Sequence, residues 1–438
     1  MPAYLQCFDP ACAQRYPLGA SDHVCERCGS LLEVRYEGRH EDDPAPPQKL
    51  RAAWLQRRSS NRIEDQSGVW RFRELLPFVS DTAQIVSLSE GHTPLLEVPK
   101  AAAYAGGVHL TVKHQGNNPT GSFKDLGMTA CVTAARIFGN RVIACASTGN
   151  TSASMAAYGA RAGMKAVVFV PAGKISSAKL AQALEFGATV IEISANFDEA
   201  LRLLRSIRAE LGLYVVNSIN PFRFEGQKTI ACEILEQRDW KVPDHIVVPG
   251  GNLGNVSAIA KGLFELKAWG FIDRLPRLVV TQAEGANPFY RLWKQKQQEI
   301  VSIANPSTEA SAIRIGDPVN WKKAQQALLH TEGLCESVSD DEIFAAKEAL
   351  AQDGVGCEPA SAATVAGIKK LAASRQIEAG ADVVAILTGH QLKDPESSLR
   401  RREEKDLARQ RIRVDADLKK LRWALENVLH VEPQLSLK

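Results

Sequence analysis

Residues 141–171 have the sequence RVIACASTGNTSASMAAYGARAGMKAVVFVP. The stretch starts with an apolar run, continues through a polar turn into a helix-like segment, and ends with a second apolar run. Two more apolar runs follow, TVIEIS from Thr189 and YVVNS from Tyr214, so that successive runs begin roughly 23–25 residues apart. Strand, helix and strand at this spacing predict βαβ units that build a parallel sheet.

Three more strand candidates occur later in the chain. They are HIVVPGG from His245, RLVVTQAEG from Arg277 and DVVAILTGH from Asp382. The body of the chain, about residues 68–395, is therefore predicted to be an open α/β fold with two lobes. In such sheets ligands bind outside the carboxyl ends of the strands, so the turns that follow strands are the first candidates for a site.

The bulk composition is that of an ordinary globular protein. The 438 residues are more than one hydrophobic core usually covers, so two or three domains are expected. The net charge of +3 gives no reason to expect nucleic acid or a membrane surface as the main partner. No apolar run of about 18 residues and no signal-peptide pattern is present. Nine cysteines, an odd number, argue against a disulfide framework and predict the reducing environment of the cytoplasm.

The turn NPTGSFKD, residues 118–125, precedes an apolar helical segment. Ser122 is the candidate N-cap, which places Lys124 in the first helical turn. The helix dipole disfavours a cation there, so the neutral amine is favoured and Lys124 is a candidate imine-forming nucleophile. The alternative is an exposed lysine beside Asp125.

Three other turns follow strand candidates. Residues 147–152, STGNTS, offer backbone N–H groups and hydroxyls that could hold a carboxylate or another anion, although a plain helix cap is the alternative. Residues 250–255, GGNLGN, suit a phosphate at a helix N-terminus but fit neither the dinucleotide pattern nor the nucleoside-triphosphate loop. Thr388, in LTGH, would project from a strand end, or else be buried in a tight turn.

Together these motifs resemble the fold-type II pyridoxal-phosphate (PLP) enzymes, and within them the threonine synthase family. The resemblance extends to EPASAA from Glu358, SEGHTPLLEVP from Ser89, VNSINPFRFEGQKT from Val216, AIRIGDPVNW from Ala312 and LTGHQLKDP from Leu387. It runs in collinear order over about residues 68–395. It implies a two-lobed body in which a small lobe, about residues 125–215, is inserted in the large one, and homodimers are usual for the family.

The resemblance also implies a role for each motif. Lys124 would bind PLP as a Schiff base, Asn150 would bond the 3′-oxygen of its ring, and Thr388 would face the pyridine nitrogen. The loop for the cofactor phosphate would consist of Gly250, Gly251, Asn252, Leu253, Gly254 and Asn255. The substrate carboxylate would be held by Ser147, Thr148 and Thr151. Gln391 departs from the family pattern LTGHGLKDP, which has glycine there, and is expected to alter the turn after Thr388.

The implied reaction converts O-phosphohomoserine and water to threonine and phosphate, with Lys124 moving protons. A dianionic leaving group needs cations and hydrogen-bond donors. The candidates are Ser218, Asn220, Arg223, Lys228 and Lys113. Arg223 and Ser218 are the preferred pair, although a surface ion pair is the alternative for Arg223.

Cysteines are spaced as in a metal site in the first segment, residues 1–37. Cys7-x4-Cys12 and Cys25-x2-Cys28 resemble the two knuckles of a zinc ribbon. Four cysteine ligands would leave no open position, so zinc would be structural, and free thiols are the alternative. Residues 38–67 are charged and rich in proline and are expected to be a linker with a short helix.

Residues 396–438 are predicted to form a charged, amphipathic helical tail. Its apolar residues at spacings of 4, 3, 4 and 3 are Val414, Leu418, Leu421, Leu425 and Val428. The tail contains 11 Lys and Arg and 8 Asp and Glu residues, so it accounts for the whole net charge. A helix that packs on the body or on a second copy is the simpler interpretation, and a regulatory contact is the alternative.

Two other functions remain open from the sequence. The first keeps PLP chemistry with another substrate, as in a cysteate synthase that uses phosphoserine and sulfite, or in a dehydratase or ammonia-lyase. The second is a binding module without activity, against which the presence of Lys124, Asn150 and Thr388 argues. A difference of one carbon between substrates is worth only about 1–3 kcal/mol in a pocket, which sequence does not resolve.

Overall fold

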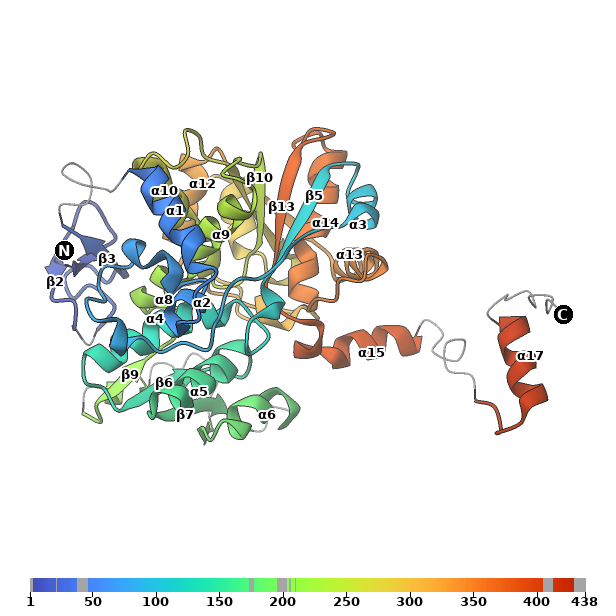
Figure 1. Cartoon of the computed structure of the whole chain (residues 1–438), viewed down its shortest axis with the longest axis horizontal. Helices are drawn as coiled ribbons and strands as arrows, with labels where there is room; N and C mark the ends of the chain where they lie inside the picture. The colour runs from blue at the N-terminus through green and yellow to red at the C-terminus, as the bar shows by residue number, and fades with distance from the viewer. Residues whose placement is uncertain are drawn as a thin grey trace. The chain divides into compact units, whose positions relative to one another are not determined.

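The computed structural model describes residues 3–20, 22–37, 46–172, 177–194, 203–204, 206–208, 210–404 and 413–428. The chain divides into two compact units, Met1–Lys393 and Asp394–Lys438 (Figure 1). In the described ranges, no helix is long and apolar enough to cross a membrane.

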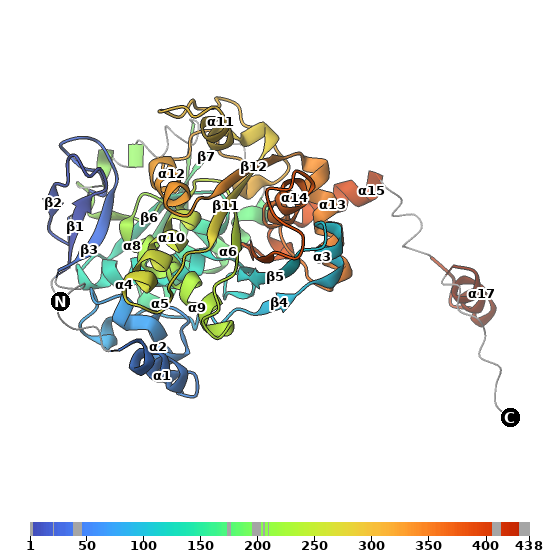
Figure 2. The same cartoon turned by 90° about the horizontal axis from the view of Figure 1, so that it is seen from above.

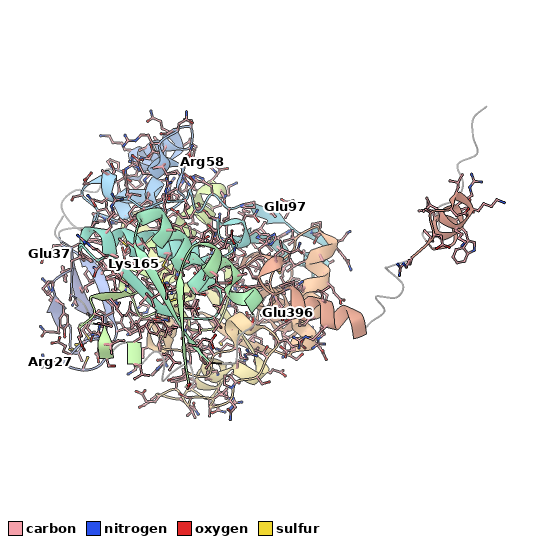
Figure 3. The ribbon with its side chains drawn as sticks, turned by 90° about the horizontal axis from the view of Figure 1, so that it is seen from below. Arg27, Glu37, Arg58, Glu97, Lys165 and Glu396 are labelled. Carbon is pink, nitrogen blue, oxygen red and sulfur yellow. The ribbon has the colours of Figure 1, made fainter. Side chains whose placement is uncertain are left out.

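The larger sheet of the first unit has the strand order β12-β11-β10-β13-β5-β4. Its strands are β4 (Leu95–Glu97), β5 (His109–His114), β10 (His245–Pro249), β11 (Arg277–Ala283), β12 (Leu334–Val338) and β13 (Asp382–Leu387). Neighbours are parallel except for β4, which pairs antiparallel with β5. Glu97 of this edge strand is exposed to solvent, a charge that discourages pairing with another chain (Figure 3).

Alternate side chains of the central strand β13 face two helical layers. Val383, Ala385 and Leu387 pack in one core, and Val384 and Ile386 pack in the other. The first core includes α3 (Pro99–Tyr104), α13 (Asp340–Gln352) and α14 (Pro359–Ala373). The second includes α9 (Thr229–Gln237), α10 (Gly254–Ala268), α11 (Pro288–Lys294) and α12 (Trp321–His330) (Figure 2). Because both faces are buried, the central strands β10 and β13 are largely apolar runs.

The smaller sheet is parallel throughout and has the order β8-β7-β6-β9. Its strands are β6 (Val142–Ala146), β7 (Lys165–Pro171), β8 (Thr189–Ile193) and β9 (Leu213–Val215), and the helices beside them are α4 (Lys124–Ile137), α5 (Asn150–Ala162) and α6 (Ser177–Glu185). Each strand lies in an apolar run from which it was predicted. The prediction of an α/β fold with parallel sheets is confirmed.

The N-terminal strands form a small antiparallel sheet in which β1 (Ala3–Cys7) pairs with β2 (Arg15–Tyr16) and β3 (Leu32–Tyr36). Strand β3 packs against α8 (Pro221–Gln227). The hydroxyl of Tyr36 donates to the Glu225 carboxylate of α8 at 2.6 Å. The ammonium of Lys261 donates to the carbonyl of Val34 at 2.7 Å and also pairs with Glu225. These contacts fix the N-terminal sheet to the body.

Helix α8 in turn lies very close to α4. A β-carbon at Gly226 would be 1.8 Å from the carbonyl oxygen of Leu126, so only glycine permits this approach. The N-terminal sheet, α8 and the helix that begins at Lys124 therefore form one continuous packed series.

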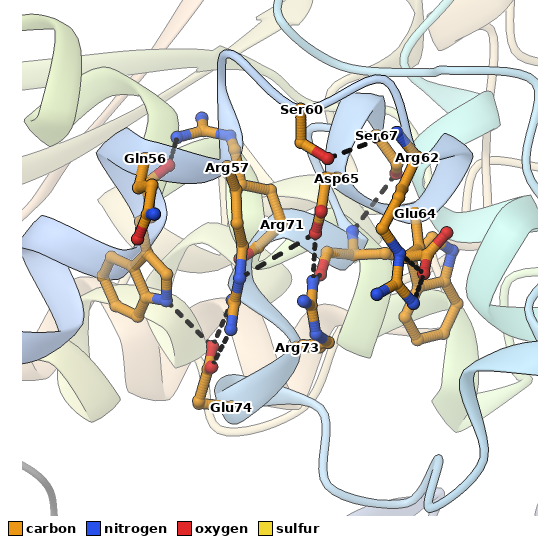
Figure 4. Close-up of polar contacts among 12 residues, drawn as sticks. Gln56, Arg57, Ser60, Arg62, Glu64, Asp65, Ser67, Arg71, Arg73 and Glu74 are labelled. Carbon is orange, nitrogen blue, oxygen red and sulfur yellow. Dashed lines mark hydrogen bonds and ion pairs between the residues drawn. The ribbon is translucent and has the colours of Figure 1, made fainter.

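Residues 46–67, part of the segment predicted as a linker, contain α1 (Pro47–Arg57) and α2 (Ile63–Gln66). The indole of Trp54 in α1 is fully buried. Figure 4 shows the polar contacts that attach these helices to the following turn, in which Arg57 pairs with Glu74 and Arg73 pairs with Asp65. This part of the segment is packed into the first unit.

Short 3-10 helices occur at η1 (Trp70–Leu75), η2 (Thr82–Gln84), η3 (Gln115–Asn117), η4 (Glu284–Ala286), η5 (Ser311–Ile313) and η6 (Gln391–Lys393). The second unit contains α15 (Pro395–Glu404) and α17 (Leu418–Val428). The predicted apolar stripe falls on α17 except for Val414, which precedes the helix. Its leucines Leu418, Leu421 and Leu425 are exposed.

Candidate functional site

Three of the predicted motifs follow neighbouring parallel strands of the larger sheet. The turn before Lys124 comes after β5, Thr388 comes directly after β13, and Gly250 comes directly after β10. These strands are adjacent in the order β10-β13-β5, so their carboxyl ends meet at one edge of the sheet. This is the edge at which ligands bind in open α/β sheets.

Backbone hydrogen bonds join the Lys124 turn to the end of β13. The N–H of Phe123 donates to the carbonyl of Thr388, and the N–H of His390 donates to the carbonyl of Gly121, both at 2.9 Å. Gly121 has φ of +84°, which glycine adopts at little cost. The predicted N-cap is wrong: α4 begins at Lys124 itself after Phe123, and Ser122 accepts only a long bond of 3.4 Å from the Lys124 N–H.

Lys124 is electrostatically unusual. The pKa of its ammonium is lowered to about 7, mainly by burial and also by the positive charge of Arg223, while the carboxylate of Glu358 opposes the shift. Its Nζ lies 4.0 Å from the centroid of the Phe123 ring. A large part of this amine is therefore neutral at pH 7, as a nucleophile or a base must be.

Asn150 and Thr388 meet at a residue that the sequence analysis gave no role. The Glu358 carboxylate accepts from Asn150 Nδ2 and from the Thr388 hydroxyl, both at 3.1 Å. Ser361 lies 3.0 Å from the Thr388 hydroxyl and accepts from the Gly389 N–H. The motif EPASAA pointed to this place, because Glu358 and Ser361 both belong to it.

The glycine-rich turn leads into α10. Leu253 has φ of +62°, and helix α10 starts at Gly254. The N–H of Gly250 donates to the carbonyl of Thr281 and is not free to bind a ligand. Gly250 is needed here for its small size, because a β-carbon would be 2.6 Å from the side chain of Val280. The amide of Asn255 is buried with neither its oxygen nor its nitrogen bonded to any described residue. A buried free amide at a helix N-terminus suits an anionic ligand.

Ser147 and Thr148 follow β6, and Thr151 lies in the first turn of α5. All three side chains are partly exposed. The end of β6 is fixed by Asn217, whose amide bonds both the N–H and the carbonyl of Ala146. Asn217 lies in the quoted motif VNSINPF, but the sequence gave no reason to assign it this role.

Arg223 is buried, with 3% of its surface exposed. It donates one bond, of 3.3 Å, to the carbonyl of Val216, and its Nε has no partner among the described residues. No carboxylate among the described residues forms an ion pair with Arg223. The alternative that Arg223 forms a surface ion pair is therefore wrong. Ser218, its preferred companion, is partly exposed, and its carbonyl accepts from buried Asn320 at 3.4 Å. A buried guanidinium without a counterion suits an anionic ligand.

The other phosphate candidates are engaged elsewhere. The Lys113 ammonium lies 2.7 Å from Glu233, and Lys228 lies 2.6 Å from Glu225, in buried ion pairs. Asn220 caps α8 by accepting from the Phe222 N–H. All three therefore serve as structural partners.

The four N-terminal cysteines meet as predicted. Their sulfur atoms all lie within 4.8 Å of one another. Cys7 lies 3.4 Å from Cys28, and Cys12 lies 3.6 Å from Cys25. None of the nine cysteines, all of which lie in the described ranges, forms a disulfide. A tetrahedral ion such as zinc fits four thiolates from two turns at this spacing.

The site fits the cofactor that the resemblance implies. PLP needs an amine for attachment, an anion site for its phosphate and polar partners for its ring. Lys124 with its lowered pKa, the unbonded Asn255 amide and the polar pair of Asn150 and Thr388 supply these groups.

Comparison with known proteins agrees with this arrangement. Residues 86–389 match the family described as pyridoxal-phosphate dependent enzyme. The chain is 44% identical to a threonine synthase of Methanocaldococcus jannaschii over 418 residues, which are 95% of this chain and 98% of that protein. It is 44% identical to a threonine synthase of Methanosarcina acetivorans over 423 residues, which are 96% and 98% of the two. One from Synechocystis is 46% identical over 349 residues, 78% and 88%.

Solved structures with the same fold are less similar in sequence. Threonine deaminase isoform 2 from Solanum lycopersicum superposes with a TM-score of 0.63 at 21% identity, covering 76% of this chain and 88% of that one. An L-serine ammonia-lyase from Rhizomucor miehei gives 0.62 at 21% identity, with 72% and 98% covered. At this level of identity they show the fold alone.

Proposed function

Since the chain belongs to the threonine synthases, a group of pyridoxal-phosphate-dependent enzymes, we propose that it converts O-phospho-L-homoserine and water to L-threonine and phosphate. PLP, when bound, supplies an electron sink for the negative charge that develops at the substrate's α-carbon. Residues of the chain would bind and orient the cofactor and the substrate and would transfer the protons.

Lys124 would hold the cofactor and then move protons. Its Nζ is the amine with a pKa near 7 at this edge of the sheet, so it can take a proton from the substrate and return it at neutral pH. Asn150 would orient the ring through the 3′-oxygen, and Thr388 would face the ring nitrogen. The turn from Gly250 to Asn255 would bind the cofactor phosphate at the N-terminus of α10.

The substrate assignment is supported chiefly by Arg223, which is buried and has no carboxylate partner among the described residues. A buried guanidinium without a carboxylate costs stability, so its presence needs a compensating role. The phosphate of the substrate is an anion of the right kind, and Arg223 lies close enough to Lys124 to affect its pKa. Ser218 would donate a second bond to the same phosphate. Ser147, Thr148 and Thr151 would hold the substrate carboxylate at the start of α5.

The substrate assignment is tested by phosphate release. We expect the purified enzyme to release phosphate from O-phospho-L-homoserine and to form threonine in equal amount. O-phospho-L-serine with sulfite is one methylene shorter and should react with a kcat/KM lower by about 10-fold to 200-fold. The reverse order of the two substrates would move the enzyme to the cysteate synthases on the same scaffold, and the yellow colour of bound PLP confirms that the cofactor is present in either case.

We also propose that Cys7, Cys12, Cys25 and Cys28 bind one structural zinc ion. The support is the approach of all four sulfur atoms within 4.8 Å. Elemental analysis should find about one zinc per chain, and Cys25→Ala should lose it and lower the Tm, because the binding free energy of a structural metal is part of the folding free energy. Cys335→Ala, at a buried cysteine of β12, is the matched control and should keep its zinc. Four thiols that titrate freely in the chain as purified would contradict the proposal.

We propose a cytoplasmic location, because none of the nine cysteines forms a disulfide. We propose that the protein is a homodimer, because homodimers are usual for the family. We also propose that residues 68–395, approximately, form the catalytic body between the cysteine-containing segment and the helical tail.

A further inference from the structure

Glu358 is a buried acid beside the catalytic lysine, and the proposed mechanism leaves it without a role. It is 4% exposed and directly precedes α14. A β-carbon at Gly389 would come within 2.4 Å of its carboxyl carbon, so the carboxylate rests on the backbone of the turn after β13. Its own N–H donates to the carbonyl of Gly389 at 3.0 Å. The position of this side chain is therefore closely fixed.

The two hydrogen bonds of Glu358 reach two different lobes of the body. Asn150 belongs to the first turn of α5 beside the smaller sheet, whereas Thr388 follows β13 of the larger sheet. One carboxylate accepts from both at 3.1 Å. We assign Asn150 to the 3′-oxygen and Thr388 to the nitrogen of the cofactor ring, so Glu358 fixes the separation of two groups that contact the ring.

Charged groups surround Glu358 on the elements that pack against it. Lys124 at the start of α4 and Lys393 in η6 both favour its ionised form, while burial, which is the larger effect, raises its pKa. In the other direction the Glu358 carboxylate raises the pKa of Lys124, against burial and the charge of Arg223. The charge of Glu358 is thus part of what determines the protonation of the catalytic amine.

We propose that Glu358 is a positioning residue of the reaction, which holds Asn150 and Thr388 at a fixed separation and balances the charge of Arg223 at Lys124. This inference rests on the proposed cofactor site, and it adds a residue to which the resemblance assigned no role. A glutamate that only stabilised the turn after β13 would affect folding and leave the chemistry of Lys124 unchanged.

The test compares Glu358→Gln, Glu358→Ala and a matched control, Glu336→Gln, at a buried glutamate of β12. The first measurement is the rate at which the apo-protein captures added PLP, followed by absorbance from pH 5.5 to 9. Capture needs the neutral amine, so the rate of the wild type should rise through about pH 7. Loss of the negative charge lowers the pKa of Lys124, and the midpoint for Glu358→Gln should move to lower pH. The control should follow the wild type.

The second measurement separates positioning from folding. Glu358→Gln keeps one acceptor oxygen in place of two, so either Asn150 or Thr388 keeps its partner. Its affinity for PLP should stay within about threefold of the wild type while kcat falls by about 10-fold to 100-fold with little change in KM. Glu358→Ala leaves both donors without a partner and should also lose about 10-fold in PLP affinity.

An unchanged midpoint and kcat in a well-folded Glu358→Gln variant would overturn the proposal. A shifted midpoint in a protein that makes no threonine from any phosphorylated substrate would support the role of Glu358 and count against the proposed function instead. The pH dependence of PLP capture thus tests the role of Glu358, and threonine formation tests the proposed function.

Discussion

Lys124→Ala is expected to lower the kcat for phosphate release from O-phospho-L-homoserine by about 10³-fold or more, because proton transfer by one positioned group is worth about 10²-fold to 10⁴-fold and covalent attachment of PLP is lost as well. Another amine that acts on Glu358 belongs to Lys393, which donates to the carbonyl of Thr120 at 3.0 Å and also bonds Gln182. It is not placed to replace Lys124. The purified variant should also lack the yellow colour of the wild type.

Two further variants make this result specific. Lys124→Arg keeps a long cationic side chain but cannot deprotonate, so it should be as inactive as the alanine variant. Lys165→Ala removes an exposed lysine at the start of β7 (Figure 3) and should keep wild-type activity and colour. Lys165→Ala should also melt close to the wild type. If Lys124→Ala kept more than about a tenth of the activity, the assignment of the catalytic amine would be wrong.

Arg223→Met is expected to remove activity and leave stability intact or improved. Methionine fills a similar apolar space, and replacement of a buried charge by an apolar side chain is often neutral or stabilising. Loss of the phosphate-binding cation should lower kcat/KM for O-phospho-L-homoserine by about 10²-fold to 10³-fold, as does removal of one donor from a site where charge develops. The pKa of Lys124 should rise, since the positive charge of Arg223 lowers it. Steady-state kinetics, thermal melting and the pH dependence of PLP capture measure the three effects.

Arg71→Met is the matched control for that substitution. Arg71 is as buried as Arg223, but it is paired with Glu236 at 2.5 and 2.7 Å. Removing one partner of a buried pair leaves an uncompensated charge and costs about 3–5 kcal/mol, so this variant should melt well below the wild type. A loss of stability in Arg223→Met as large as that in Arg71→Met would instead make Arg223 a structural residue.

The fold and the turns of the site could be predicted because both depend on local patterns. A strand followed by a glycine-containing turn and a helix places the turn at the carboxyl end of a parallel sheet, wherever the strand finally pairs. This is why Lys124, Gly250 and Thr388 were found from short motifs. The four cysteines met for a similar reason, since each pair lies in one tight turn and the pairs are joined by a short antiparallel sheet.

The roles that depend on distant partners could not be predicted in the same way. Lys113 and Lys228 looked like free cations in the sequence. In the fold Lys113 is neutralised by the distant Glu233, and Lys228 is neutralised by the nearby Glu225 together with the distant Glu265. Arg223 had the opposite outcome, because no acid of the described chain reaches it. Glu358 belongs to a motif that was recognised in the sequence, but its proposed importance comes from contacts with two residues that lie beside different sheets and meet only in the folded chain.

The hydrogen bond from Tyr36 to Glu225 also sets an order of events during synthesis of the chain. The two residues are 189 positions apart, so at a translation rate of about 5–20 residues per second the phenol emerges about 10–40 s before its acceptor. The four cysteines are all made by residue 28, before Glu225 emerges. The contacts that hold the N-terminal sheet thus wait for Glu225 and Lys261 in the middle of the chain and for Lys323 after them.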